Sequence, residues 1–166
     1  IVFVAERAPL RVTKRWRLPK EGERFDLPLT VTVENTGARP VSQRLVAVAT
    51  GWQDPSVKSG GIMAFGRRED LAMGLCYVDG KLQSGTLESL QKEAVSKAGP
   101  VGWVGIGQHY NFFLTAIALP FSSTDGATRS CRLGGDASGA ITARAVLAPQ
   151  TINPGATATW DFAAYA

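Results

Sequence analysis

The stretch FDLPLTVTV, residues 25–33, sets the expected fold because apolar side chains occupy every second position along it. These apolar residues are Phe25, Leu27, Leu29, Val31 and Val33. A period of two places them on one face of a β-strand, whose other face carries Asp26, Thr30 and Thr32. The stretch therefore predicts a strand with one face buried and the other in solvent.

The segments on either side of this strand continue the pattern. Upstream, Arg11, Thr13, Arg15 and Arg17 alternate with apolar residues, which predicts a second strand with a basic exposed face. Downstream, residues 35–40 (NTGARP) contain turn formers, and an apolar run follows over residues 45–49. We expect this run to be the antiparallel neighbour of the strand over residues 25–33.

The rest of the chain alternates short strand patterns with turn residues. Residues 71–83 predict a hairpin around Asp79-Gly80, and two more strands are expected over residues 141–147 and 156–162. One short helix is expected between Thr86, which can cap it, and the Gly99-Pro100 stop. The fold class is therefore mainly β, a mainly antiparallel sandwich with at most one or two short helices.

Residues 101–120 (VGWVGIGQHYNFFLTAIALP) are long and apolar enough to raise the question of a membrane span. Gln108, His109 and Asn111 would lie at its centre, where polar side chains are costly, so we interpret the stretch as two buried strands with a polar break. The core candidates are Trp103, Phe113 and, in the last strand, Trp160.

Length and charge limit the possible classes of protein. With 166 residues, 45% hydrophobic and 19% charged, residues 1–166 are expected to form one folded domain. The net charge of +4 equals the excess of Lys and Arg in the first 24 residues. Arg11, Arg15 and Arg17 are interpreted as a solvated strand face, with an anionic lipid surface or acidic partner as the functional alternative. No basic helix or known module indicates nucleic acid.

Catalytic and metal-binding patterns are weak. The one histidine, His109, excludes a two-histidine metal site, and no nucleophile motif or phosphate loop accompanies it. Cys76 and Cys131 are too few and too far apart for a zinc site, which leaves a disulfide or two buried thiols. Scattered carboxylates leave acid–base pairs open. We predict no enzyme activity, no cofactor and no metal.

Three segments in order resemble the bacterial YidC-type membrane protein insertases. Residues 102–120 (GWVGIGQHYNFFLTAIALP) are similar to a family segment that starts Gly-Trp-Val, continues with Tyr-Phe and ends in Pro. Asn111 departs from it, since it separates Tyr110 from Phe112. Residues 14–41 resemble a Lys/Arg-rich lead-in, a strand and an Asn-x-Gly-x-x-Pro turn, and residues 146–166 resemble the closing strands after a Pro-Gly turn.

The resemblance implies an extracytoplasmic domain with an antiparallel β-supersandwich like that of galactose mutarotase-type proteins. It implies a non-catalytic scaffold or interaction module on the periplasmic side of the inner membrane, within a multi-pass protein that assists insertion and folding of inner-membrane proteins. Sec translocon components and nascent membrane proteins would be its partners. The periplasm is oxidising, so a Cys76–Cys131 disulfide follows. A numbering without an initial Met fits a piece excised from a longer membrane protein. The alternative function is a carbohydrate-binding or carbohydrate-active supersandwich.

Overall fold

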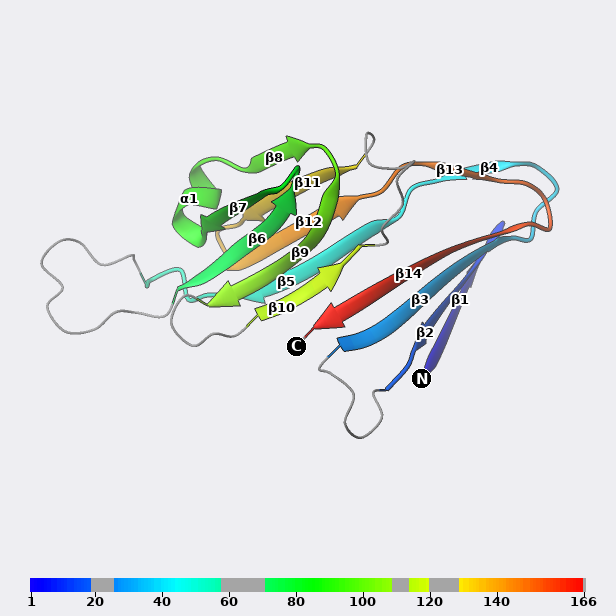
Figure 1. Ribbon diagram of the computed structural model, residues 1–166, viewed down its shortest axis with the longest axis horizontal. Helices are drawn as coiled ribbons and strands as arrows, with labels where there is room; N and C mark the ends of the chain where they lie inside the picture. Colours follow the sequence, from blue (N-terminus) through cyan, green and yellow to red (C-terminus); the bar gives the residue numbers. More distant parts are fainter. Residues whose placement is uncertain (19–25, 58–70, 109–113, 120–128, 166) are drawn as a thin grey trace, which may run out of the picture.

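The computed structural model describes residues 1–18, 26–57, 71–108, 114–119 and 129–165. Its strands form a larger sheet with the order β1-β2-β3-β14-β10-β9-β6-β7, and every neighbouring pair is antiparallel (Figure 1). The bounds are β1 Val2–Arg7, β2 Leu10–Trp16, β3 Asp26–Asn35, β14 Thr157–Tyr165, β10 Leu114–Ala118, β9 Val101–Gln108, β6 Ala72–Val78 and β7 Lys81–Thr86.

A smaller sheet packs against one half of the larger one. Its order is β5-β12-β11-β8, again antiparallel throughout, and a third, two-stranded sheet pairs β13 with β4. The bounds are β5 Val46–Trp52, β12 Ala140–Val146, β11 Ser130–Gly135, β8 Val95–Ala98, β13 Gln150–Ile152 and β4 Val41–Gln43. Within the described residues the one helix is α1, Leu87–Lys92. The expected fold class, a mainly antiparallel β-sandwich with at most one or two short helices, is confirmed.

The core lies where the smaller sheet covers β6, β9 and β10. Val104 of β9, Leu133 of β11 and Ile141 of β12 are fully buried there. Gly51 of β5 allows close approach, because a Cβ on it would lie 2.6 Å from the Ile106 side chain. The two sheets therefore interlock through small and branched side chains, as expected for packed sheets about 10 Å apart.

The disulfide expected from the family resemblance is confirmed. Cys76 of β6 and Cys131 of β11 are bonded, with Cα atoms 6.5 Å apart, and both residues have no exposed surface. Because β6 and β11 belong to different sheets, the bond ties the larger sheet to the smaller one inside the core.

The expected pairing of the residue 25–33 strand with the apolar run over residues 45–49 is wrong. The strand, β3, lies between β2 and β14, and the run, within β5, belongs to the other sheet. The buried Asn35 side chain organises the departure from β3: its Nδ2 donates to the carbonyls of Arg39 (2.7 Å) and Ile152 (2.8 Å), and its Oδ1 accepts from the Gly37 amide (3.0 Å). The chain therefore crosses between sheets here instead of folding back.

The predicted hairpin and helix both form, with one difference in length. Asp79 (φ 50°) and Gly80 (φ 73°) turn β6 into β7, with the two positive φ angles typical of a tight Asp-Gly hairpin. The Thr86 hydroxyl accepts from the Ser89 amide and caps α1. The helix stops at Lys92, well before Gly99-Pro100, because residues 95–98 pair with β11 as β8. A helix of six residues is marginal without packing, and strand pairing with β11 fixed the structure of the residues that follow it.

Candidate interaction surfaces

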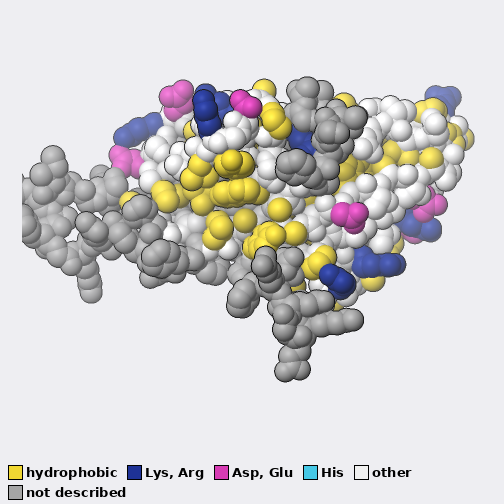
Figure 2. Space-filling model, in the orientation of Figure 1, with side chains coloured by type: hydrophobic (Ala, Val, Ile, Leu, Met, Phe, Trp, Pro, Cys, Tyr) yellow, Lys and Arg dark blue, Asp and Glu magenta, His cyan; other side chains and the backbone are white. Residues whose placement is uncertain are grey.

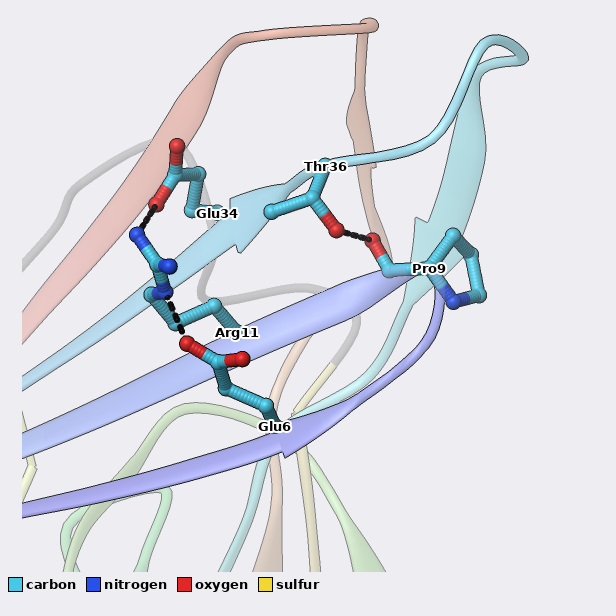
Figure 3. Close-up of polar contacts among 5 residues, drawn as sticks. All are labelled: Glu6, Pro9, Arg11, Glu34 and Thr36. Atoms are coloured by element: carbon cyan, nitrogen blue, oxygen red, sulfur yellow. Dashed lines mark hydrogen bonds and ion pairs between the residues drawn. The ribbon is translucent and has the colours of Figure 1, made fainter.

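The outer face of the half-sheet β1-β2-β3-β14 carries the predicted basic residues. In the antiparallel register Glu6, Arg11 and Glu34 stand opposite one another on this face. Arg11 Nε lies 2.6 Å from Glu6 Oε1, and its Nη1 lies 3.4 Å from Glu34 Oε2 (Figure 3). The hydrogen bond to Glu6 and the charges of both carboxylates raise the pKa of Arg11. Arg11 is therefore already paired within its own sheet.

The other two predicted arginines lie further along the same face. Arg15 stands in register with Thr30, whose hydroxyl donates to the Asp161 carboxylate at 2.7 Å. Arg17 follows β2, and its amide still donates to the Pro28 carbonyl (3.0 Å), which extends the pairing by one step. Neither Arg15 nor Arg17 takes part in an ion pair among the described residues. Of the three arginines, these two are available for an anionic partner.

The inner face of the same half-sheet is apolar and lines a cleft of about 660 Å³. Its floor comes from Val12 of β2, Leu29 and Val31 of β3, and Phe162 of β14. One wall is the start of β5 with the residue before it, from Leu45 to Val48. The cleft lies where the smaller sheet ends, at β5. Beyond this edge the described residues supply no further strand of the smaller sheet, while the inner face of β1, β2, β3 and β14 continues (Figure 1).

The sequence alone does not predict this cleft. The sequence shows only that apolar side chains recur at alternate positions over residues 10–16 and 25–33, which predicts that one face of each strand is buried. This alternation does not predict which strand packs on the apolar face or where that strand ends. Within the described lining, the one charged residue is Lys14, which stands opposite Phe3 and Val31.

A second apolar surface lies on the outer face of β6, β7, β9 and β10. Leu82, Tyr77 and Trp103 stand side by side in register, and Leu82 is 56% and Tyr77 40% exposed. The rings of Tyr77 and Trp103 stack with centroids 6.3 Å apart. Figure 2 shows hydrophobic side chains gathered over these strands.

The expectation that Trp103 lies in the core between two sheets needs correction. Trp103 is half-buried, and its parity is opposite to that of Val104 and Ile106, which face the smaller sheet. Residues 101–106 are apolar or Gly at every position, so the sequence gives no alternation from which to choose the inner face. Trp160 is buried at 5% exposure, and Phe113 and His109 lie outside the described residues.

No arrangement for metal or cofactor chemistry emerges from the described residues. They contain no group of three His, Cys, Asp or Glu side chains close enough to hold a metal ion. The carboxylates with shifted pKa values serve turns: the hydroxyl and amide of Ser56 lower the pKa of Asp54, and the Ser138 hydroxyl with the Ala140 amide lowers that of Asp136. Among the described segments, no helix has the length and apolar composition to cross a bilayer.

Comparisons with known proteins identify a family. The sequence profile of the YidC periplasmic domain matches residues 1–166. No curated protein matches the sequence. Among solved structures, the Slr1438 protein of Synechocystis sp. PCC 6803 superposes with a TM-score of 0.55 at 6% identity, over 94% of this chain and 54% of that one.

A putative aldose 1-epimerase from Klebsiella pneumoniae subsp. pneumoniae MGH 78578 matches with a TM-score of 0.33 at 10% identity, over 99% of this chain and 53% of that one. The chain therefore spans about half the length of both solved structures.

Proposed function

The chain belongs to the family of YidC periplasmic domains, and on that premise we propose that it acts as a non-catalytic interaction module of a membrane protein insertase. The proposed module belongs to a multi-pass protein of the bacterial inner membrane, on its periplasmic side. Its partners are Sec translocon components and nascent membrane proteins. The match of the family to every residue from 1 to 166 is the observation that carries this proposal.

The character of the surfaces supports an interaction role. One half-sheet has a polar outer face, on which Arg15 and Arg17 have no ion-pair partner among the described residues, and an apolar inner face that lines a cleft. The neighbouring half-sheet exposes Leu82 and Tyr77. Exposed apolar patches of this kind mark contact sites on soluble domains. Sugar chemistry needs acid–base groups that converge in a cleft, and in the described lining the one charged residue is Lys14, so nothing there favours the carbohydrate-active alternative.

The test is binding of the purified chain to a detergent-solubilised Sec translocon, with an unrelated β-sandwich protein and an unrelated membrane protein as controls. We expect retention of the translocon by this chain and not by the control sandwich. Equal retention by both sandwiches, or retention of the unrelated membrane protein as well, contradicts the proposal. A binding screen with monosaccharides and disaccharides on the same sample would support the alternative if it gave a saturable signal.

The predicted contact with anionic lipid is a separate part of the proposal. Arg15 and Arg17 supply the available charge, since Arg11 is paired with two carboxylates. Co-sedimentation with vesicles of anionic lipid should weaken as salt rises, because exposed charges are screened beyond about 10 Å at 0.1 M salt. An Arg15→Gln, Arg17→Gln variant should lose this binding, and Arg11→Gln should keep it. Binding that does not depend on salt excludes a role for this face.

A further inference from the structure

Two arginines stand directly opposite each other on the outer face of the smaller sheet. Arg132 of β11 and Arg144 of β12 are register partners, and the Asp136 amide donates to the Ala140 carbonyl (3.0 Å) where their strands join. Because hydrogen-bonded pairs alternate along an antiparallel ladder, Arg132 and Arg144 form such a pair, with Cα atoms about 5.5 Å apart. Leu133, the next residue along β11, has no exposed surface because it faces the larger sheet, so both exposed arginines point the other way.

This arginine pair has no carboxylate beside it in its row of the sheet. The row across the four strands consists of Ser96, Arg132, Arg144 and Val48. Like charges directly opposite each other on a sheet are destabilising, and the ion pairs among the described residues include neither arginine. On the larger sheet, by contrast, Arg11 lies between Glu6 and Glu34 in a row of the same kind and pairs with both. The row in the smaller sheet therefore leaves two positive charges for an external anion.

Both arginines line a hollow of about 350 Å³ on the same face. Its floor carries little side-chain bulk, since Gly134 follows on β11 while Ala140 and the half-buried Thr142 belong to β12. A Cβ on Gly134 would meet no atom within 4 Å except Thr142 Oγ1, at 3.6 Å, so this glycine keeps the floor open. Leu90 of α1 and the nearby Ala94 complete the lining. The volume is at the small end of the range for ligand sites in proteins.

One carboxylate, that of Asp136, also lines the hollow but is occupied by the turn between β11 and β12. It accepts from the hydroxyl (2.6 Å) and amide (2.9 Å) of Ser138 and from the Ala140 amide (3.1 Å). The Gln91 side chain donates to the Asp136 carbonyl (2.6 Å), which ties α1 to this turn. Hydrogen bonds therefore hold the rim of the hollow in place without using either arginine.

We propose that Arg132, Arg144 and Thr142 form a binding site for a phosphate monoester. A guanidinium group presents parallel N–H donors to two oxygens, so one carboxylate satisfies one arginine. A phosphate monoester has three terminal oxygens and a charge of about −1.5 to −2 at pH 7, which suits two opposing arginines and a hydroxyl together. A phosphodiester has only two terminal oxygens and one charge, and it fits less well. The inference goes beyond the interaction role proposed above and does not depend on it.

The probe is sodium glycerol 3-phosphate, titrated into the purified chain at constant ionic strength and at about pH 7.5, above the second pKa of phosphate monoesters. Amide NMR shifts are the readout, and we expect saturable shifts of the Gly134 and Thr142 amides. Arg132→Gln and Arg144→Gln should each weaken binding at least tenfold, because each removes charged hydrogen bonds. Arg39→Gln, which removes an exposed arginine after β3, is the control and should leave binding within twofold. Dimethyl phosphate, a diester, should bind more weakly than glycerol 3-phosphate.

A stability measurement separates lost binding from a damaged fold. Arg132→Gln removes a like-charge contact, so its urea midpoint in chloride buffer should equal or exceed that of the parent. Glycerol 3-phosphate should raise the midpoint of the parent, because a ligand that binds only the folded state stabilises it, and should not raise that of Arg132→Gln. A midpoint of Arg132→Gln below that of the parent in chloride would show that this arginine supports the sheet, and it would overturn the inference.

Vesicles identify the source of the phosphate group, which a free compound and a lipid headgroup both present. Co-sedimentation with phosphatidic acid vesicles that is lost in the Arg132→Gln, Arg144→Gln double variant assigns a lipid. Saturable binding of glycerol 3-phosphate without such co-sedimentation assigns a free compound.

Two results overturn the inference. One is a set of amide shifts that do not saturate or that sodium chloride reproduces, because these report screening and not a site. The other is a tetra-aspartate peptide that shifts the Gly134 and Thr142 amides when glycerol 3-phosphate does not, which assigns the arginines to an acidic protein partner.

Discussion

The two halves of the eight-stranded sheet follow the same rule of alternation and end in different surroundings. In the half formed by β6, β7, β9 and β10, the smaller sheet covers the inner face, and Val104 is fully buried. In the half formed by β1, β2, β3 and β14, Val31 and Phe162 are buried, but Val12 and Leu29 on the same inner face are only half-buried and line an open cleft. Alternation therefore defines which face of a strand is apolar, and the strands that pack on this face decide how much of it is buried.

The largest expected effect is removal of the disulfide in the covered half. The cysteines are 55 residues apart, and closing such a loop contributes about 4 kcal/mol in the chain-entropy model. A Cys76→Ala, Cys131→Ala variant should therefore lose about 4 kcal/mol of unfolding free energy, measured by urea titration. Reduction of the disulfide in the unmodified chain is the control, and it should lower the unfolding free energy by a similar amount. A variant as stable as the parent would show that the two sheets need no covalent tie.

A matched pair of leucines compares the two halves directly. Leu133 is fully buried beneath the larger sheet, so Leu133→Ala should cost about 3 kcal/mol, because truncation leaves a cavity that the core fills only in part. Leu29 is half-buried at the cleft, so Leu29→Ala should cost about 1 kcal/mol, since solvent already reaches the site. Urea titrations of both variants measure the difference. Equal losses would mean that the cleft is filled in solution.

The aromatic stack on the outer face of the covered half should matter less than core packing. Trp103→Ala is expected to cost about 1–2 kcal/mol, not to unfold the chain, because Trp103 is half-buried and pairs with Tyr77. Tyr77→Ala should cost a similar amount, and the double variant less than the sum of the two, since both remove one contact. Thermal and urea melts of the three variants decide this. If Trp103→Ala unfolds the chain while Tyr77→Ala does not, Trp103 packs as a core residue.

The smallest expected effect concerns the turn between β11 and β12 in the covered half. The Asp136 carboxylate accepts from the Ser138 hydroxyl (2.6 Å) and the Ala140 amide (3.1 Å), which lowers its pKa. A carboxyl with a lowered folded-state pKa stabilises the fold above its unfolded pKa, and this contribution disappears as pH falls through the folded-state value.

Asp136→Asn should therefore lower the urea midpoint at about pH 6, and the difference from the parent should shrink as pH falls below the unfolded-state pKa of the carboxyl. Asp79→Asn, in the exposed turn between β6 and β7, is the control. A pH-independent difference between Asp136→Asn and the parent would show that the carboxylate charge has no part in the turn.

Much of the fold could be predicted from local signals. The strand predicted over residues 25–33, the Asp79-Gly80 hairpin and the Thr86 cap depend on residues close together in sequence. The strand is present from Asp26 to Asn35, and the hairpin and the cap both form. Strand pairing could not be predicted in the same way, because β3 and β5 are close in sequence but lie in different sheets. The basic face could be anticipated, although the pairing of Arg11 with Glu34, 23 residues away, could not.

By itself the sequence determined that this chain is a β-rich domain, where most strands lie, which faces of the alternating strands are apolar, and, through three family segments, to which proteins it is related. These properties depend on side-chain period and turn chemistry, which act over a few residues. Only the tertiary structure decided that Val104 and not Trp103 faces the core, and that β5 ends the smaller sheet beside an open cleft. Both depend on contacts between strands distant in sequence, and a strand of continuous apolar residues can present either face until a second sheet packs on one of them.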